Sequence, residues 1–381
     1  MTEVASPVAG PSLEPVVAAA SVVVCCGSGG VGKTTVAAAI AVEAARRGRR
    51  VVVVTIDPAR RLAEALGVPD GLAAMPQRVA LEAATEGPGE LWAMMLDTAA
   101  AFDDVVRRYA TSHEQAERIV ANPFFQNIAG SLSGTQEYMA SETLYLLHDD
   151  DRFDLVVVDT PPTRSALDFL QAPGVLARFL DHRLFKLMML PARTGMRVVG
   201  LATQPMLRLT GKVVGTEVLA DAVAFFQAFA GMEGGFSQRA QAVAALLRAE
   251  GTRFVVVTSP RHEAVEEATW FADQLDRQGM TRLSGVANRL TPSFAADPAG
   301  GRARKPAGVG AAGDETTARL RATLEVLRTR RAAELDELVP FAARFSDDAV
   351  VEVPLLASDV HDTVGLAHVG HHLFPDPDSP F

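Results

Sequence analysis

Cysteine is almost absent from this chain. Its 381 residues include two, Cys25 and Cys26, which are adjacent in an apolar run that predicts a strand. Neighbouring side chains on a strand point to opposite faces, so this pair favours neither a structural disulfide nor a zinc site. We expect both thiols to lie in the core of a cytoplasmic protein that is kept reduced.

Lysine and clustered positive charge are also scarce. The chain has four lysines and a formal net charge of −10. Nucleic-acid binding requires clustered lysine and arginine against the phosphates, so we expect no nucleic acid as a partner. The first twenty residues lack the basic start of a signal peptide, and the apolar stretch at residues 16–26 is too short to cross a bilayer. The sequence therefore predicts no stable insertion into a membrane.

What the chain does contain is a series of apolar, β-branched runs. Several of them are continuous rather than alternating, which is typical of strands buried on both faces of a parallel sheet. Because helical patterns separate these runs, they predict an α/β protein, with a doubly wound and mostly parallel sheet. The expected strands are residues 22–26, 50–56, 155–158, 254–258, 283–287 and 350–353.

A glycine-rich run joins the first expected strand to a helical pattern. Glycines let consecutive backbone N–H groups point at one anion, Lys33 can reach the β- and γ-phosphates of a nucleotide, and the Thr34 hydroxyl can bind Mg²⁺. The run therefore predicts a site for ATP or GTP with Mg²⁺. Its residues are Gly27, Ser28, Gly29, Gly30, Val31, Gly32, Lys33, Thr34 and Thr35.

The same run also fits the dinucleotide-binding pattern Gly-x-Gly-x-x-Gly. Gly27, Gly29 and Gly32 have that spacing, and Asp57 follows the next expected strand. A dinucleotide site has no use for Lys33 and Thr34 directly after the last glycine, whereas a triphosphate with Mg²⁺ needs both. We therefore favour the triphosphate over the dinucleotide.

We expect the rest of the chain to be arranged around this loop as one phosphate-loop domain over residues 21–374. Long helical patterns without strands at residues 97–148 and 175–250 predict a helical subdomain added to the sheet. Three segments rich in glycine, alanine or proline are expected to be flexible, namely residues 1–20, 292–314 and 375–381.

Two aspartates follow expected strands of the sheet. Ligands of open α/β sheets bind outside the carboxyl ends of the strands, so Asp57 and Asp159 should meet at the phosphate loop. Asp159, after four apolar residues, is a candidate for binding Mg²⁺, and Asp57 for orienting the water that attacks the phosphate. Either aspartate could instead cap a helix.

The loop and three further runs together resemble the arsenical-pump ATPase family, which includes the ATPase that guides tail-anchored proteins to their membrane. The resemblance covers about residues 21 to 366, without the expected flexible insert. The three runs are Asp57-Pro58-Ala59, Asp159-Thr160-Pro161-Pro162-Thr163 and Val286-Ala287-Asn288-Arg289.

This resemblance implies a dimer that closes around two ATP molecules. It places Mg²⁺ on the Thr34 hydroxyl, orients the attacking water near Asp57 and senses the γ-phosphate near Asp159. Closure would reshape the helical subdomain and so couple the nucleotide state to client binding. The implied adenine contacts are Asn288, with Pro354 and Leu355 beside it.

The chain departs from the family pattern in its charges. Ser28 stands where members carry a signature lysine that reaches across the dimer, and Arg61 stands where they have a water-contacting asparagine. Arg60, Arg61 or Arg164 could supply the missing charge as arginine fingers, or could be solvated surface residues. A paralogous ATPase bearing the lysine is another source, so both a homodimer and a heterodimer stay open. No Cys-x-x-Cys is present to hold a zinc ion between subunits.

A methionine-rich stretch between Leu184 and Leu207 is the candidate surface for a hydrophobic helical client. Flexible methionine side chains suit promiscuous apolar surfaces, although such a stripe can equally be core. We favour an Mg²⁺-dependent ATPase that acts as a dimeric switch for a hydrophobic client or membrane partner. A weakly hydrolysing regulatory subunit of a heterodimer is the alternative that Ser28 supports. An arsenite-efflux motor is a further alternative, which the scarcity of thiols disfavours.

Overall fold

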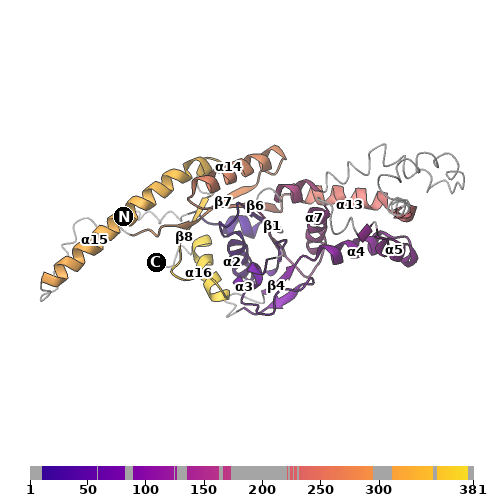
Figure 1. The fold of residues 1–381 in the computed structure, drawn as a ribbon, viewed down its shortest axis with the longest axis horizontal. Coiled ribbons are helices and arrows are strands. Elements are labelled where there is room, and N and C mark those ends of the chain that lie inside the picture. The colour runs from indigo at the N-terminus through magenta and orange to yellow at the C-terminus, as the bar shows by residue number, and fades with distance from the viewer. Residues whose placement is uncertain are drawn as a thin grey trace, which may run out of the picture.

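The computed structural model describes most of the chain between residues 11 and 375. Excepted are the segments 82–88, 127–134, 163–165, 173–220, 295–310 and 346–349, and the single positions 58, 124, 222, 223, 226 and 230. The described part forms an α/β sheet protein with helices on both faces of the sheet (Figure 1).

The centre is an eight-stranded sheet with the order β3-β4-β2-β5-β1-β6-β7-β8. All neighbouring strands are parallel except β3, which pairs antiparallel with β4 at one edge. The expectation of a doubly wound, mostly parallel sheet is therefore confirmed. The strands are β1 (Val22–Gly27), β2 (Arg50–Thr55), β3 (Gln77–Val79), β4 (Glu90–Met95), β5 (Leu155–Asp159), β6 (Thr252–Thr258), β7 (Leu283–Leu290) and β8 (Val350–Pro354).

Helices cover both faces of the sheet and extend beyond it at two ends (Figure 1). Among the described helices, none combines the length and the apolar character needed to cross a membrane. The main described helices are α1 (Glu14–Ala18), α2 (Lys33–Arg46), α3 (Arg61–Ala65), α4 (Thr98–Tyr109), α5 (His113–Val120), α7 (Thr135–His148), α13 (Glu233–Leu246), α14 (His262–Arg277), α15 (Ala311–Ala342) and α16 (Thr363–Leu373).

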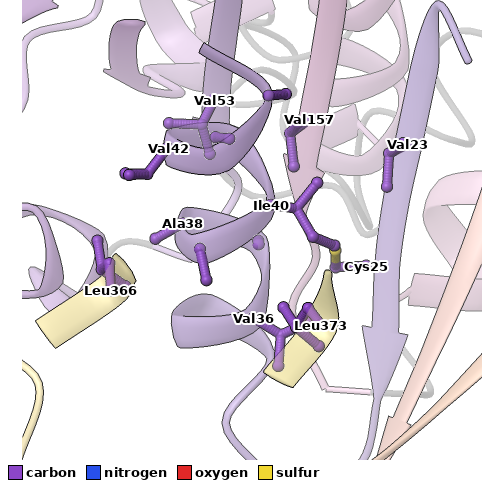
Figure 2. Packing of buried hydrophobic residues seen from close by; sticks show 14 of the residues in the cluster. Val23, Cys25, Val36, Ala38, Ile40, Val42, Val53, Val157, Leu366 and Leu373 are labelled. Atoms are coloured by element: carbon purple, nitrogen blue, oxygen red, sulfur yellow. The ribbon is translucent and has the colours of Figure 1, made fainter. Parts of the chain in front are cut away.

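Two hydrophobic clusters form the core, one on each face of the sheet. Strand residues alternate between them, so Cys25 lies in the cluster with α2 and α16, and Cys26 in the cluster with α7, α14 and the end of α15. Figure 2 shows Ile40 of α2 beside Cys25, with Leu373 of α16 nearby. Both thiols are free and buried, which confirms their expected place in the core.

A third cluster belongs to the expected helical subdomain. It joins side chains of α4, α5, α7 and α13, and it includes Ile119, Phe125 and Phe236. Helix α7 also packs on the sheet through Leu144 and Leu147, so it serves both parts. Within the predicted helical stretch 97–148, the described residues form α4, α5 and α7, while residues 127–134 lie outside the described part, as do residues 173–220. The helical subdomain itself stays a prediction.

Two expected boundaries are wrong. Residues 1–20 are predicted to be a flexible tail; residues 1–10 lie outside the described part, but Leu13 and Val17 are buried in the core, and the Leu13 backbone N–H donates to the Leu373 carbonyl at 2.9 Å. The expected flexible insert ends too late, because α15 begins at Ala311. At the N-terminal end, tertiary packing outweighs a local composition rich in alanine and proline. At the insert, the long helix α15 outweighs a composition rich in alanine, glycine and proline.

The docking of α1 can be tested by truncating Leu13, whose side chain is 1% exposed. We expect Leu13→Ala to lower the free energy of unfolding in urea by about 2–4 kcal/mol, because the lost methyl groups come from a closed core. Leu320→Ala on α15, where the leucine is 66% exposed, is the matched control and should change stability by less than about 0.5 kcal/mol. A loss of stability in Leu13→Ala as small as that in Leu320→Ala would contradict the docking of α1 on the core.

Candidate phosphate-binding site

The glycine-rich loop leaves the sheet at Gly27, the last residue of β1, and enters α2 at Lys33. Its backbone leaves no room for side chains at two glycines. Gly27 has φ +151°, and a Cβ there would collide with the Val257 carbonyl of the neighbouring strand. Gly32 has φ +94°, and a Cβ there would collide with the Asn288 amide. The sequence thus forms the strand, loop and helix arrangement that a phosphate-binding loop requires.

Lys33 folds back over this loop. Its Nζ donates a hydrogen bond of 2.9 Å to the Ser28 carbonyl, and the side chain is buried. Burial lowers the pKa of Lys33, and the nearby negative charge of Asp159 opposes that shift. A cation held inside the loop in this way is placed to accompany an anion that enters it.

Asp159 lies beside the loop because β5 pairs with β1 and β2. The register sets Asp159 opposite Cys25 on one side and Thr55 on the other. Its Oδ2 accepts a hydrogen bond of 3.0 Å from the Thr55 hydroxyl, while its buried Oδ1 has no partner. Burial raises the pKa of Asp159 to about 6, against the opposing effects of the Thr34 and Thr55 hydroxyls and of Lys33.

Thr55 connects this aspartate to Asp57. Besides donating to Asp159, the Thr55 hydroxyl accepts a hydrogen bond of 3.2 Å from the Asp57 backbone N–H. Sequence reasoning missed this threonine. The only signal was its place at a strand end, two residues before an aspartate.

Asp57 itself is held in a local turn. Its Oδ1 accepts a hydrogen bond of 3.0 Å from the Ala59 N–H, and its Oδ2 lies 3.5 Å from the exposed Arg61 guanidinium. Helix α3 has Arg60 at its N-cap position, so Asp57 does not cap it. The half-buried Asp57 carboxylate therefore lies at the same edge of the sheet as Asp159. Its Oδ2 is engaged only in the 3.5 Å ion pair with Arg61.

Asn288 reaches the loop from β7. Its Nδ2 donates a hydrogen bond of 2.8 Å to the Val31 carbonyl, and its Oδ1 accepts one of 2.9 Å from the Arg289 N–H. The expected adenine contact of Asn288 is untested, and here the amide holds the loop. Pro354 ends β8 nearby, and the Leu355 N–H donates to the Leu290 carbonyl at 2.7 Å, leaving the Leu355 side chain exposed.

The residues that depart from the family pattern have different surroundings. Ser28 is buried, and its hydroxyl has no hydrogen-bond partner. Arg60 is exposed and lines a cavity of about 80 Å³ beside Thr55. Arg164 and the stretch between Leu184 and Leu207 lie outside the described residues, so both stay predictions.

The chain is similar in sequence to known ATPases. A family model described as an anion-transporting ATPase matches residues 20–305. The chain is 29% identical over 170 residues to the ATPase GET3 of Kluyveromyces lactis, covering 42% of this chain and 45% of that protein. It is 29% identical over 127 residues to the ATPase GET3 of Malassezia globosa, covering 33% and 34%. The chain thus matches less than half the length of these curated relatives.

The shape of the loop can be tested with two glycine variants. We expect Gly32→Ala to lower the free energy of unfolding by about 1–3 kcal/mol, because it strains a left-handed backbone and displaces the Asn288 amide. Gly29→Ala is the control, since a Cβ there meets no atom within 4 Å, and it should stay within about 0.5 kcal/mol of wild type. Chemical denaturation without nucleotide measures both, and equal losses would contradict the loop geometry.

Proposed function

Because the chain belongs to the anion-transporting ATPase family, we propose that it binds ATP with Mg²⁺ and hydrolyses it at the loop of residues 27–35. The observation that carries this proposal is the meeting of Lys33, Asp57 and Asp159 at one edge of the sheet, where the Thr55 hydroxyl links the two aspartates. Phosphoryl transfer depends mainly on positioning and on stabilising charge, and these groups provide both.

The donor set fits a magnesium ion. The buried Oδ1 of Asp159 has no partner within the protein, and the Thr34 hydroxyl lies close to this carboxylate. Carboxylate and hydroxyl oxygens are ligands that Mg²⁺ accepts, usually together with waters and phosphate oxygens. When bound, Mg²⁺ would neutralise charge that develops on the phosphates. Thr34 and Asp159 would hold it.

The side chains then have distinct tasks. Lys33 would exchange the Ser28 carbonyl for phosphate oxygens, which are stronger acceptors for a cation. Asp57 would orient the attacking water through the oxygen that is only weakly paired with Arg61. The Thr55 hydroxyl keeps both aspartates in register, since it bonds to the backbone of one and the carboxylate of the other.

We further propose that the chain works as a dimeric switch for a hydrophobic client or a membrane partner. Support comes from the helix at residues 166–172, which follows Asp159 closely in the sequence. Its Phe169 packs in the sheet cluster, and its Ala172 packs in the cluster of the helical subdomain. A shift of the segment after Asp159 would therefore move side chains in both parts.

The subdomain also contains a polar cluster that is only partly satisfied. Arg239 of α13 donates a hydrogen bond of 2.8 Å to Glu142 of α7, yet one further atom of each of these side chains, and the hydroxyl of a neighbouring tyrosine, are buried without a partner. A half-satisfied buried network costs free energy, which favours rearrangement of α7 against α13 when another packing pairs these groups. The three atoms are Glu142 Oε2, Arg239 Nη2 and Tyr138 Oη.

One specific observation supports the alternative that the chain is a weakly hydrolysing regulatory subunit of a heterodimer. Ser28, at the position of the family's signature lysine, is buried with an unsatisfied hydroxyl and brings no charge to a partner. A heterodimer with a paralogous ATPase would restore that charge. The arsenite-efflux alternative has less support, because arsenite is held by thiolates, and both cysteines are buried in β1.

Hydrolysis by the purified chain tests the proposed activity. We expect Lys33→Ala to abolish measurable ATP turnover, and Asp57→Asn to lower kcat at least about 100-fold while nucleotide binding is retained, because water orientation acts on the chemical step. Asp276→Asn, which alters an exposed carboxylate on α14, is the control and should turn over ATP like wild type.

The molecular mass of the protein in solution, measured with and without nucleotide, distinguishes the two candidate functions. Turnover with a nucleotide-dependent dimer supports the self-sufficient switch. Tight ATP binding by a chain that never turns over points instead to a regulatory subunit. A chain that binds no nucleotide contradicts both.

Metal dependence tests the assignment of Asp159. We expect Asp159→Asn to raise the Mg²⁺ concentration needed for half-maximal turnover more than about tenfold, since a charged ligand of the ion is lost. Titration of Mg²⁺ at fixed ATP measures this, with Asp276→Asn again as the control. An unchanged Mg²⁺ requirement would remove Asp159 from the metal site.

A further inference from the structure

Arg289 interrupts the regular end of β7. The pairing of β7 with β8 shifts register between Asn288 and Leu290, so Arg289 occupies a β-bulge. Its φ is +63°, the left-handed region, and it is the one non-glycine residue of the described chain with positive φ. Bulges and strained non-glycine backbones concentrate near functional sites, where they redirect a side chain.

The guanidinium is directed onto the phosphate loop. Nη1 of Arg289 donates a hydrogen bond of 2.8 Å to the Gly30 carbonyl, while Asn288 donates to the carbonyl of the next residue, Val31. Two consecutive side chains of β7 therefore hold two consecutive carbonyls of the loop. Without the bulge, successive residues of a strand would point to opposite faces and could not both reach it.

Holding these carbonyls also sets the direction of the loop's N–H groups. In a planar trans peptide, the C=O and the N–H of the following residue point in opposite directions. Drawing the Gly30 and Val31 carbonyls toward β7 therefore turns the N–H groups of Val31 and Gly32 away from β7. The concave anion site of a phosphate loop is formed by backbone N–H groups that are free to face the anion.

We propose that Arg289 is a positioning residue that preorganises the anion-binding face of the phosphate loop. This inference rests on the proposed nucleotide site and assigns a role that the loop motif itself does not contain. Arg289 acts through the Gly30–Val31 peptide rather than by touching the γ-phosphate. The bulge places the Arg289 backbone in a strained conformation in the free protein. Because the loop is already ordered by this contact, binding of the β-phosphate requires less further ordering.

Arg289→Gly separates this role from a merely structural one. Glycine adopts φ +63° without strain, so the variant loses the guanidinium but keeps the bulge. We expect Mg-ADP and Mg-ATP to bind about tenfold more weakly, to a similar extent, because both place a β-phosphate in the loop. The melting temperature without nucleotide should stay unchanged or rise, since strain is relieved. Calorimetric titration and thermal denaturation give these values.

Two further variants complete the test. Arg289→Lys keeps the charge and one donor and should recover part of the lost affinity. Arg282→Ala, just before β7, removes an exposed pairing with Glu250 and should leave affinity unchanged. Unchanged affinity in Arg289→Gly, a loss for ATP alone, or a lower melting temperature together with weaker binding would overturn the positioning role. Failure of wild type to bind any nucleotide would overturn the proposed function and this inference together.

Discussion

The parallel register of three strands is the constraint on which the rest of the site depends. Because Cys25, Thr55 and Asp159 are neighbours across β1, β2 and β5, the glycine loop, Asp57 and Asp159 all leave the sheet at one edge. Continuous apolar side chains on both faces bury these strands between helices, and this burial holds the register. The site is thus positioned by the core, and the Thr55 hydroxyl adds a polar link where the strands end.

Much of this arrangement could be predicted from the sequence, since it rests on local patterns. The apolar runs identified six strands, and the loop motif with the two aspartates predicted the edge of the sheet at which the structure brings these residues together. Strand β4 was missed because its Leu-Trp-Ala-Met-Met run has no β-branched residue. Helix α1 was missed because its stability comes from Leu13 and Val17 packing on distant residues rather than from its own composition.

The parts of the site that escaped prediction are those that depend on tertiary contacts. Thr55 is an ordinary strand residue until the register brings Asp159 within 3.0 Å of its hydroxyl. Arg289 contacts Gly30 only because a β-bulge interrupts the pairing of β7 with β8. No local pattern in the sequence predicts this bulge. Asn288 was identified by resemblance to a family, yet its observed bonds are to the loop backbone and to Arg289. Motifs identify the chemistry of such a site, and contacts across the sheet decide its geometry.

The central claim is that these strand ends form a single site for Mg²⁺ and a nucleoside triphosphate. A crystal structure of the chain with Mg²⁺ and a non-hydrolysable ATP analogue tests it most directly. The account predicts the β-phosphate inside the loop of residues 27–35, the metal between Thr34 and Asp159, and Asp57 facing the γ-phosphate. A nucleotide bound elsewhere, or a metal that Asp159 does not approach, would contradict it.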